Sequence, residues 1–194
     1  IVTVAAFMAK GDLPNLKKSL ATTLDNGMTV NQAKEVLVHL YAYTGFPRSL
    51  NALSTLNNLV QERKAAGIND EMGPDATPLD FIDRLAKGTE IQTAISGRVV
   101  TNEFAPIINT FLREHLFYDI FARDVLTWQQ RELATVGALA GIGNVNPAAY
   151  FAFRAAMNTG LTPEQLQEAV DVLNETVSTD TGSNAQAVLN NVLK

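Results

Sequence analysis

Residues 29–48 read TVNQAKEVLVHLYAYTGFPR, and they contain a full set of start and stop signals for a helix. Thr29 and Gln32 have the spacing of a capping box, in which two side chains satisfy unpaired backbone groups of the first turn. Gly45 marks the end of the helix, and the proline two residues later suits the first turn of the next one. The pattern therefore predicts a helix over 30–44, followed directly by another.

A stripe of polar side chains follows one face of this predicted helix. Glu35, His39 and Tyr43 are four residues apart, so they lie one above the other beside the apolar face. The amides that open the next helix are partially positive, and Arg48 adds a full charge there. We expect these four residues to converge on one pocket. The alternative is a purely structural role for these residues. In that case His39 is a core histidine whose ring nitrogens are hydrogen-bonded, and Tyr43 is a core residue with a hydrated hydroxyl.

The same signals recur toward the other end of the chain. Residues 1–13 align with 133–145, and residues 14–60 align with 147–193. The aligned positions include capping boxes, helix-ending glycines and helix-opening prolines, namely Thr29/Thr162, Gln32/Gln165, Gly27/Gly160 and Pro14/Pro147. We therefore predict an all-α helical bundle made of two tandem, diverged repeats.

The polar stripe is confined to the first copy. His39 corresponds to Val172 and Arg48 to Thr181, whereas the capping positions persist. A packing role would give no reason for the loss in one copy only, so this difference favours a functional site in the first copy.

The region between the copies is rich in turn-forming residues. Segment 67–80 contains Gly, Asn, Asp and Pro in close succession, so we assign it to a linker between a first repeat, 1–66, and a second repeat, 81–194. Helical periodicity returns over 81–86 and again over 103–118.

The composition excludes several classes of function. The 194 residues carry a net charge of −5, so no basic surface is available for nucleic acid. No apolar run approaches the roughly 20 residues that a membrane span needs. The absence of cysteine excludes disulfides and thiolate chemistry, and we expect no metal site and no cofactor. Ile1 is not a methionine and falls within a predicted helix, so we expect further residues upstream; the compartment, cytoplasm or periplasm, stays open.

Residues 35–53, EVLVHLYAYTGFPRSLNAL, resemble the carboxymuconolactone decarboxylase family, whose pattern is E-x-x-x-H-L-x-x-Y-x-G followed by W/F-P-R-x-x-x-A-L. Residues 131–140, RELATVGALA, resemble the same family's helix opening, R-E-L-x-T-L-A-A-L. The resemblance covers most of the chain. It implies a compact bundle of the alkylhydroperoxidase-like type that forms homo-oligomers, with pockets near subunit interfaces.

The resemblance also implies a chemistry. The family includes decarboxylases of γ-carboxymuconolactone, which carry a histidine where this chain has Ser19. It also includes redox proteins with a C-x-x-C motif; without cysteine, this chain is not such a peroxidase. Lactone decarboxylation needs a cation for the carboxylate, an apolar pocket and an acid. We assign the acid to His39, assisted by Tyr43 or Glu35. The candidate substrate-binding residues are Arg48, Phe46, Ser19 and Asn51.

Two functions follow as hypotheses. The first is decarboxylation or isomerisation of a small carboxylated lactone or related acid; the second is a non-catalytic ligand-binding or assembly module of the same fold. Glu132 is a further candidate, because the matching glutamate of the redox relatives belongs to a proton relay. A glutamate in the first turn of a helix is, however, ordinarily there for the helix dipole. His115 has no motif around it, and we interpret it as a surface or interface residue.

Overall fold

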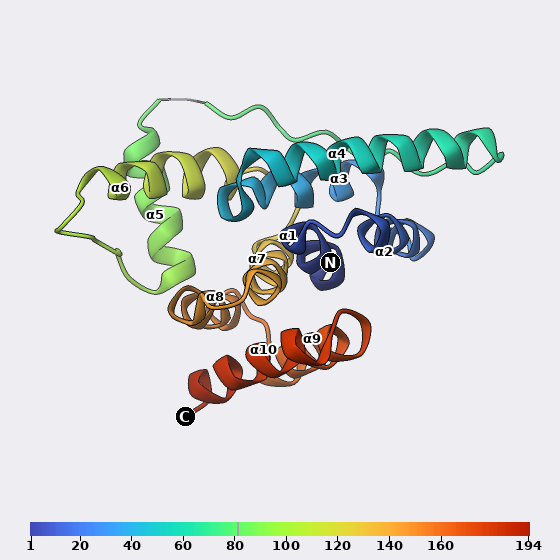
Figure 1. Cartoon of the computed structure of the whole chain (residues 1–194). Coiled ribbons are helices and arrows are strands. Elements are labelled where there is room, and N and C mark those ends of the chain that lie inside the picture. The colour runs from blue at the N-terminus through green and yellow to red at the C-terminus, as the bar shows by residue number, and fades with distance from the viewer. Residues whose placement is uncertain (81) are drawn as a thin grey trace.

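The computed structural model describes residues 1–80 and 82–194, and the regular elements among them are all helices (Figure 1). The helices are α1 (Val2–Lys10), α2 (Leu13–Asp25), α3 (Val30–His39), α4 (Tyr41–Ala65), α5 (Arg84–Ser96), α6 (Ile107–Thr110), the π-helix η1 (Phe111–Ile120), α7 (Trp128–Ile142), α8 (Asn146–Asn158), α9 (Pro163–Thr176) and α10 (Thr179–Val192). The predicted all-α class is confirmed.

Many helix boundaries coincide with the signals in the sequence. Thr29, Thr127 and Thr162 each cap the helix that follows, and the glutamine three residues further on bonds back to the threonine amide. Gly27 and Gly160 have φ values of +90° and +105°, in the left-handed region that residues with a Cβ avoid. Local chemistry therefore sets where these helices begin and end.

Helices α1 and α7 lie side by side in the middle of the molecule (Figure 1). Two glycines of α7 make this close approach possible. A Cβ at Gly137 would lie 2.5 Å from the Val2 carbonyl oxygen, and one at Gly141 would lie 2.6 Å from that of Ala6. The backbones of the two helices are therefore in contact where any larger residue would separate them.

Two hydrophobic clusters meet at this central pair. The first joins α1 to α2, α3 and α4, and it also contains Ala134 and Ala138 from α7. The second joins α7 to α8, α9 and α10, and it also contains Val2 and Ala6 from α1. Figure 1 shows α2–α4 on one side of the pair and α8–α10 on the other. Each half of the chain thus supplies core residues to the other half. The division of the chain into two tandem repeats and a linker stays a prediction.

The helix expected over 30–44 has a different boundary. Helix α3 ends at His39 and α4 begins at Tyr41, with Leu40 between them. The turn expected at Gly45 is a bend inside α4, where the backbone leaves helical geometry at φ 79° and ψ 161°. The chain changes direction at the predicted residue, but the backbone is helical on both sides of the bend.

The connecting region also differs from expectation in detail. The helix expected over 103–118 begins at Ile107 and becomes a π-helix from Phe111 onward. Phe81, which we expected to open a helix, lies outside the described residues, and α5 begins at Arg84.

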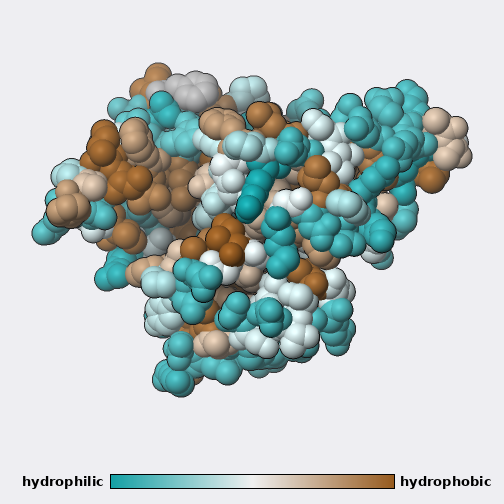
Figure 2. All heavy atoms as spheres, in the orientation of Figure 1, coloured by the Kyte–Doolittle hydropathy of each residue, from teal (hydrophilic) through white to brown (hydrophobic). Residues whose placement is uncertain are grey.

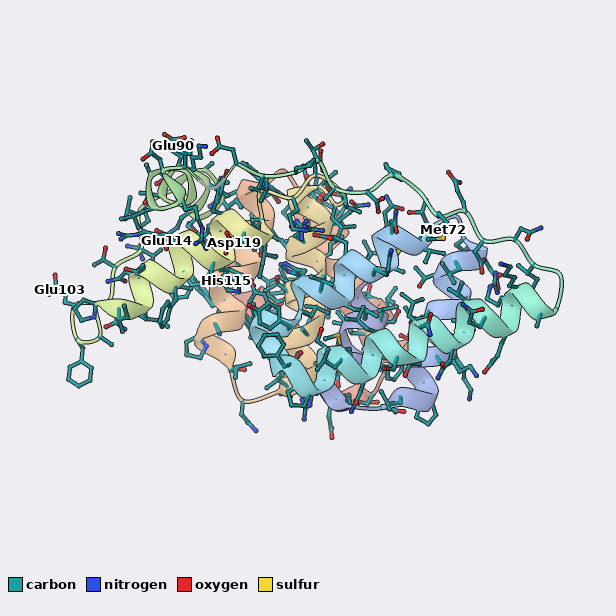
Figure 3. All side chains as sticks on the ribbon, turned by 90° about the horizontal axis from the view of Figure 1, so that it is seen from above. Met72, Glu90, Glu103, Glu114, His115 and Asp119 are labelled. Carbon is teal, nitrogen blue, oxygen red and sulfur yellow. The ribbon has the colours of Figure 1, made fainter. Side chains whose placement is uncertain are left out.

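Residues 68–80 contain no helix and run along the start of α3. The backbone amides of Val30 and Asn31 donate to the carbonyls of Glu71 and Met72, each at 2.9 Å. Figure 3 shows Met72 where this segment crosses the N-terminal helices. The segment therefore satisfies amides that the start of α3 would otherwise leave unpaired.

Candidate functional site

The predicted polar stripe faces the interior, and Glu35 lies there in a cluster of charges. Its carboxylate accepts hydrogen bonds from Arg131 at 2.7 Å and from Arg123 at 2.8 and 2.9 Å. Burial acts to raise the pKa of Glu35, but the bonds from the two guanidinium groups outweigh it and hold the pKa below its usual range. Glu35 is therefore an ionised residue that joins α3 to α7.

His39 is fully buried and bonds to a side chain of α7. Its Nε2 lies 3.0 Å from the Thr135 hydroxyl oxygen, and that hydroxyl donates to the Arg131 carbonyl at 3.0 Å. Since the hydroxyl has only one proton, His39 must donate from Nε2. Burial, aided by the Arg131 charge, lowers the pKa of His39 to about 3, so the ring is neutral.

Arg48 reaches the end of a different helix. Its guanidinium donates to the Ala9 carbonyl in the last turn of α1, beside Gly11, where that helix ends. A cation at this position satisfies a free carbonyl and complements the negative end of the helix dipole.

The remaining predicted substrate-binding residues lie in separate places. Phe46 is 63% exposed and stacks on Tyr41 with ring centroids 4.6 Å apart. Ser19 donates to the Thr3 hydroxyl at 2.8 Å, and Asn51 is exposed on α4.

His39 and Arg48 therefore do not reach the same cavity, and the prediction that they converge is wrong. His39 points to α7, whereas Arg48 points to the end of α1. Four-residue spacing placed Glu35, His39 and Tyr43 on one face as expected, but the bend at Gly45 directs Arg48 elsewhere.

A cavity of about 370 Å³ lies among α5, η1, α7 and α8, with Tyr43 of α4 also on its wall. Most of the wall is apolar, and its larger apolar side chains include Ile95, Leu116, Phe117, Phe121, Leu139 and Phe151. A larger cavity of about 580 Å³ lies between α4 and residues 68–72, but the carboxylate on its wall, Asp70, is paired with Arg63. The cavity of about 370 Å³ differs, because the carboxyl group on its wall has no such ion-pair partner among the described residues.

That acid is Glu132 of α7. It is 3% exposed, and no hydrogen bond or ion pair to its carboxyl is found among residues 1–80 and 82–194. Burial raises the pKa of Glu132 to about 8, so the carboxyl is mainly protonated near pH 7. A buried, neutral carboxyl on the wall of a cavity is a group that can deliver a proton.

Tyr43 and Thr135 lie beside this carboxyl on the same wall. Burial raises the pKa of Tyr43, Glu132 raises it further, and Thr135 opposes the increase. His39 stands behind Thr135, so it holds the wall in place without lining the cavity. Of the predicted site residues, Tyr43 and Glu132 share the cavity.

Arg154 of α8 also lines the cavity and is exposed to solvent, which places it at the mouth. No hydrogen bond or ion pair to its guanidinium is found within the described ranges, so its charge is available to a ligand. Sequence reasoning missed Arg154 because no motif surrounds it. A pattern did exist for the opposite wall, since Glu132, Thr135 and Leu139 are at i, i+3 and i+7 and therefore share one face of α7.

The described residues also bear on metal binding and on membrane insertion. No group of three or more His, Cys, Asp and Glu side chains there could hold a metal ion. None of the described helices has the length and apolar character to cross a membrane. His115 is half exposed, and its Nδ1 lies 2.9 Å from a carboxylate oxygen of Asp119, its neighbour on η1 (Figure 3).

The fold and this cavity define an all-helical protein that holds a buried carboxyl group against an apolar pocket. Residues 106–190 match the model of the Carboxymuconolactone decarboxylase family. The matched segment, somewhat less than half of the chain, is similar to this family and contains both Glu132 and Arg154. No curated protein matches the chain. Residues 35–53, which carried the most specific resemblance, lie outside the matched segment, so the two-copy arrangement stays a prediction.

Proposed function

We propose that this protein decarboxylates or isomerises a small carboxylated lactone or related acid, with Glu132 as the proton donor. One observation carries the proposal: the Glu132 carboxyl is buried, without a partner among the described residues, and on the wall of an apolar cavity. Its pKa of about 8 keeps it protonated under the conditions in which it must act. The family supports the substrate class.

The cavity contains the three parts that decarboxylation needs. Arg154 at the mouth binds the substrate carboxylate, and the apolar wall favours the step in which neutral carbon dioxide leaves and the charge spreads over the rest of the substrate. The electron pair of the broken carbon–carbon bond passes into the conjugated lactone as a dienolate. Glu132 gives its proton to a carbon of the dienolate, and water then restores the proton to Glu132.

This assignment gives His39 a different role from the one its sequence pattern suggested. Its ring is neutral, and its Nε2 proton is used in the bond to Thr135, so the proposal makes His39 a positioning residue. Tyr43, beside Glu132, is suited to donate a hydrogen bond to the oxygen on which the dienolate charge collects.

The test is the variant Glu132→Gln, which keeps the shape of the side chain but has no acidic proton. We expect kcat to fall by about 10²- to 10⁴-fold, the usual contribution of a general acid. Glu168→Gln, on the exposed face of α9, is the matched control and should leave kcat unchanged. The assay follows the release of carbon dioxide from carboxylated lactones.

The pH dependence gives a second measurement on the same site. The donor must be protonated, so kcat/KM, which reports the free enzyme, should be level below the Glu132 pKa of about 8 and fall about tenfold per pH unit above it. A Glu132→Gln enzyme as active as wild type would remove the proposal. Binding of carboxylic acids without turnover of any lactone would favour the ligand-binding module instead.

A further inference from the structure

The larger cavity, of about 580 Å³, lies between the second half of α4 and residues 68–72, and the proposed reaction makes no use of it. None of the described residues that line it also lines the cavity with Glu132. Its α4 wall runs from Leu53 to Lys64, which is roughly 16 Å of helix at 1.5 Å per residue. The cavity is therefore long enough to hold an extended chain.

The segment 68–72, which forms the opposite wall, is fixed by bonds to both α4 and α3. Its Asp70 carboxylate, 7% exposed, accepts hydrogen bonds from Arg63 of α4 at 2.8, 2.9 and 3.1 Å. The amides of Val30 and Asn31 in α3 donate to two carbonyls of the segment, each at 2.9 Å. The cavity between these attachments is therefore a built part of the fold. Its one carboxylate among the described lining residues is also neutralised, because Arg63 pairs with it.

The lining combines apolar side chains with two cations. The apolar members are Val30, Leu53, Leu56, Val60, Ile68 and Met72, the last of which is labelled in Figure 3. The cations are Lys34 of α3 and Lys64 of the last turn of α4, and both are exposed. No hydrogen bond or ion pair to either ammonium group is found within residues 1–80 and 82–194. The cavity therefore has an uncompensated positive charge, in a chain whose net charge is −5.

We propose that this cavity is a separate ligand site for an amphipathic organic anion. The acidic group of the ligand lies at the two lysines, and its apolar chain lies along Leu53, Leu56 and Val60 of α4. Binding removes apolar surface from water, and the ammonium groups meet a charge of the opposite sign. A cation of the same chain length gains the first contribution but is repelled by the lysines. The ligand is distinct from the substrate of the proposed function, and its binding does not depend on Glu132.

The position of the cavity supplies a readout that is independent of activity. A ligand there contacts α4 on one side and the segment 68–72 on the other. A protease can cut the segment only after it opens locally toward solvent, and this opening would break the contacts with the ligand. Binding should therefore slow cleavage within residues 68–80.

The experiment is a calorimetric titration at neutral pH with decanoate and with decyltrimethylammonium, which has the same chain length and the opposite charge. We expect decanoate to bind at least about tenfold more tightly, and this preference should shrink as the salt concentration rises. The double variant Lys34→Gln and Lys64→Gln should weaken decanoate by about tenfold, since exposed ion pairs contribute modestly. Lys10→Gln with Lys18→Gln removes two exposed positive charges elsewhere and is the matched control.

Limited proteolysis completes the test, because decanoate should slow cleavage within residues 68–80 of the wild type more than in the double lysine variant. Equal affinities for the two probes would overturn the inference, as would unchanged decanoate binding in the double lysine variant with its helical content intact. Binding that Arg154→Met weakens and the lysine variant does not would also overturn it, because the ligand would then lie in the other cavity. Glu132→Gln should bind decanoate as the wild type does, so loss of the proposed reaction leaves this inference standing.

Discussion

His39 and Glu132 are both buried and mainly neutral near pH 7, but they become neutral in opposite ways. The pKa of His39 falls from 6.5 to about 3, so the folded protein keeps the ring unprotonated. The pKa of Glu132 rises from 4.5 to about 8, so the folded protein keeps the carboxyl protonated. Between pH 4.5 and 6.5, folding therefore releases a proton at His39 and takes one up at Glu132, and their contributions to the pH dependence cancel.

Removing either residue should expose the contribution of the other. Glu132 adds stability that is full below pH 4.5 and is lost as the pH rises through about 8, whereas His39 costs stability as the pH falls below 6.5. Relative to wild type, His39→Gln should therefore lose stability with rising pH, and Glu132→Gln should gain it. Each slope should approach about 1.4 kcal/mol per pH unit between pH 4.5 and 6.5.

The measurement is the free energy of unfolding in urea, taken at several pH values for the three proteins. Other groups titrate in all three, so the differences between proteins isolate the two residues. Parallel curves for wild type and both variants would show that neither group is perturbed by the fold.

At this scale, periodicity predicted one part of the site correctly. The shared face of Glu35, His39 and Tyr43 follows from helical geometry alone. The partners of these residues do not, because Arg131 and Thr135 are 96 residues away from Glu35 and His39 in the chain. Only tertiary packing brings these residues together. In the folded protein their polar atoms are bonded to one another and are not available to a ligand.

Among the elements, the pairing of α1 with α7 depends most on single residues. Gly137 faces α1 at a point where a Cβ would lie 2.5 Å from the Val2 carbonyl oxygen and 2.9 Å from its Cα. These are backbone atoms, so they cannot move aside as the end of a flexible side chain can. The pairing also positions Glu132 and Thr135, since both belong to α7.

Gly137→Ala should therefore destabilise the protein by about 1–3 kcal/mol, the usual cost of overpacking. This loss should appear even though alanine favours a helix over glycine by about 0.5–1 kcal/mol. Ser54→Ala, on the exposed face of α4, introduces the same residue without a clash and should change stability by less than about 0.5 kcal/mol. Thermal unfolding of the three proteins compares them, and a stabilised Gly137→Ala protein would contradict the close contact.

The capping boxes and helix-ending glycines were predictable because they depend on residues within one turn. The π-helix η1 was not, because apolar residues at three- and four-residue steps do not distinguish it from an α-helix. The sequence also does not predict how η1 packs. Its backbone contacts α5 at Gly88, where a Cβ would lie 1.8 Å from the Arg113 carbonyl oxygen. That contact joins α5 to η1, two of the elements around the cavity.

For the whole molecule, the surface near this end of the fold is unusually apolar. Phe104 is fully exposed, and Ile107 and Phe111 are 61% and 57% exposed. Figure 2 shows brown side chains gathered over the region of α5, α6 and η1. Exposed apolar patches of this kind mark interaction surfaces, and the family resemblance led us to expect homo-oligomers.

We therefore expect the protein to self-associate through this surface. The double variant Phe104→Ser and Phe111→Ser should lower the molecular mass measured by light scattering after size-exclusion chromatography. Phe46→Ser, which changes an exposed phenylalanine on α4, is the control and should leave the mass unchanged. A wild-type protein that is monomeric at tens of micromolar would remove this expectation.

The exchange of core residues between α1 and α7 has a consequence for a broken chain. A protease cut within residues 68–80 would sever the covalent link between the halves but leave the two shared clusters intact. Each fragment alone would expose the apolar surface that the other fragment's alanines and valines cover. We therefore expect neither fragment to fold in isolation. Mixed together, they would behave as complementing fragments that regain the native fold only as a pair.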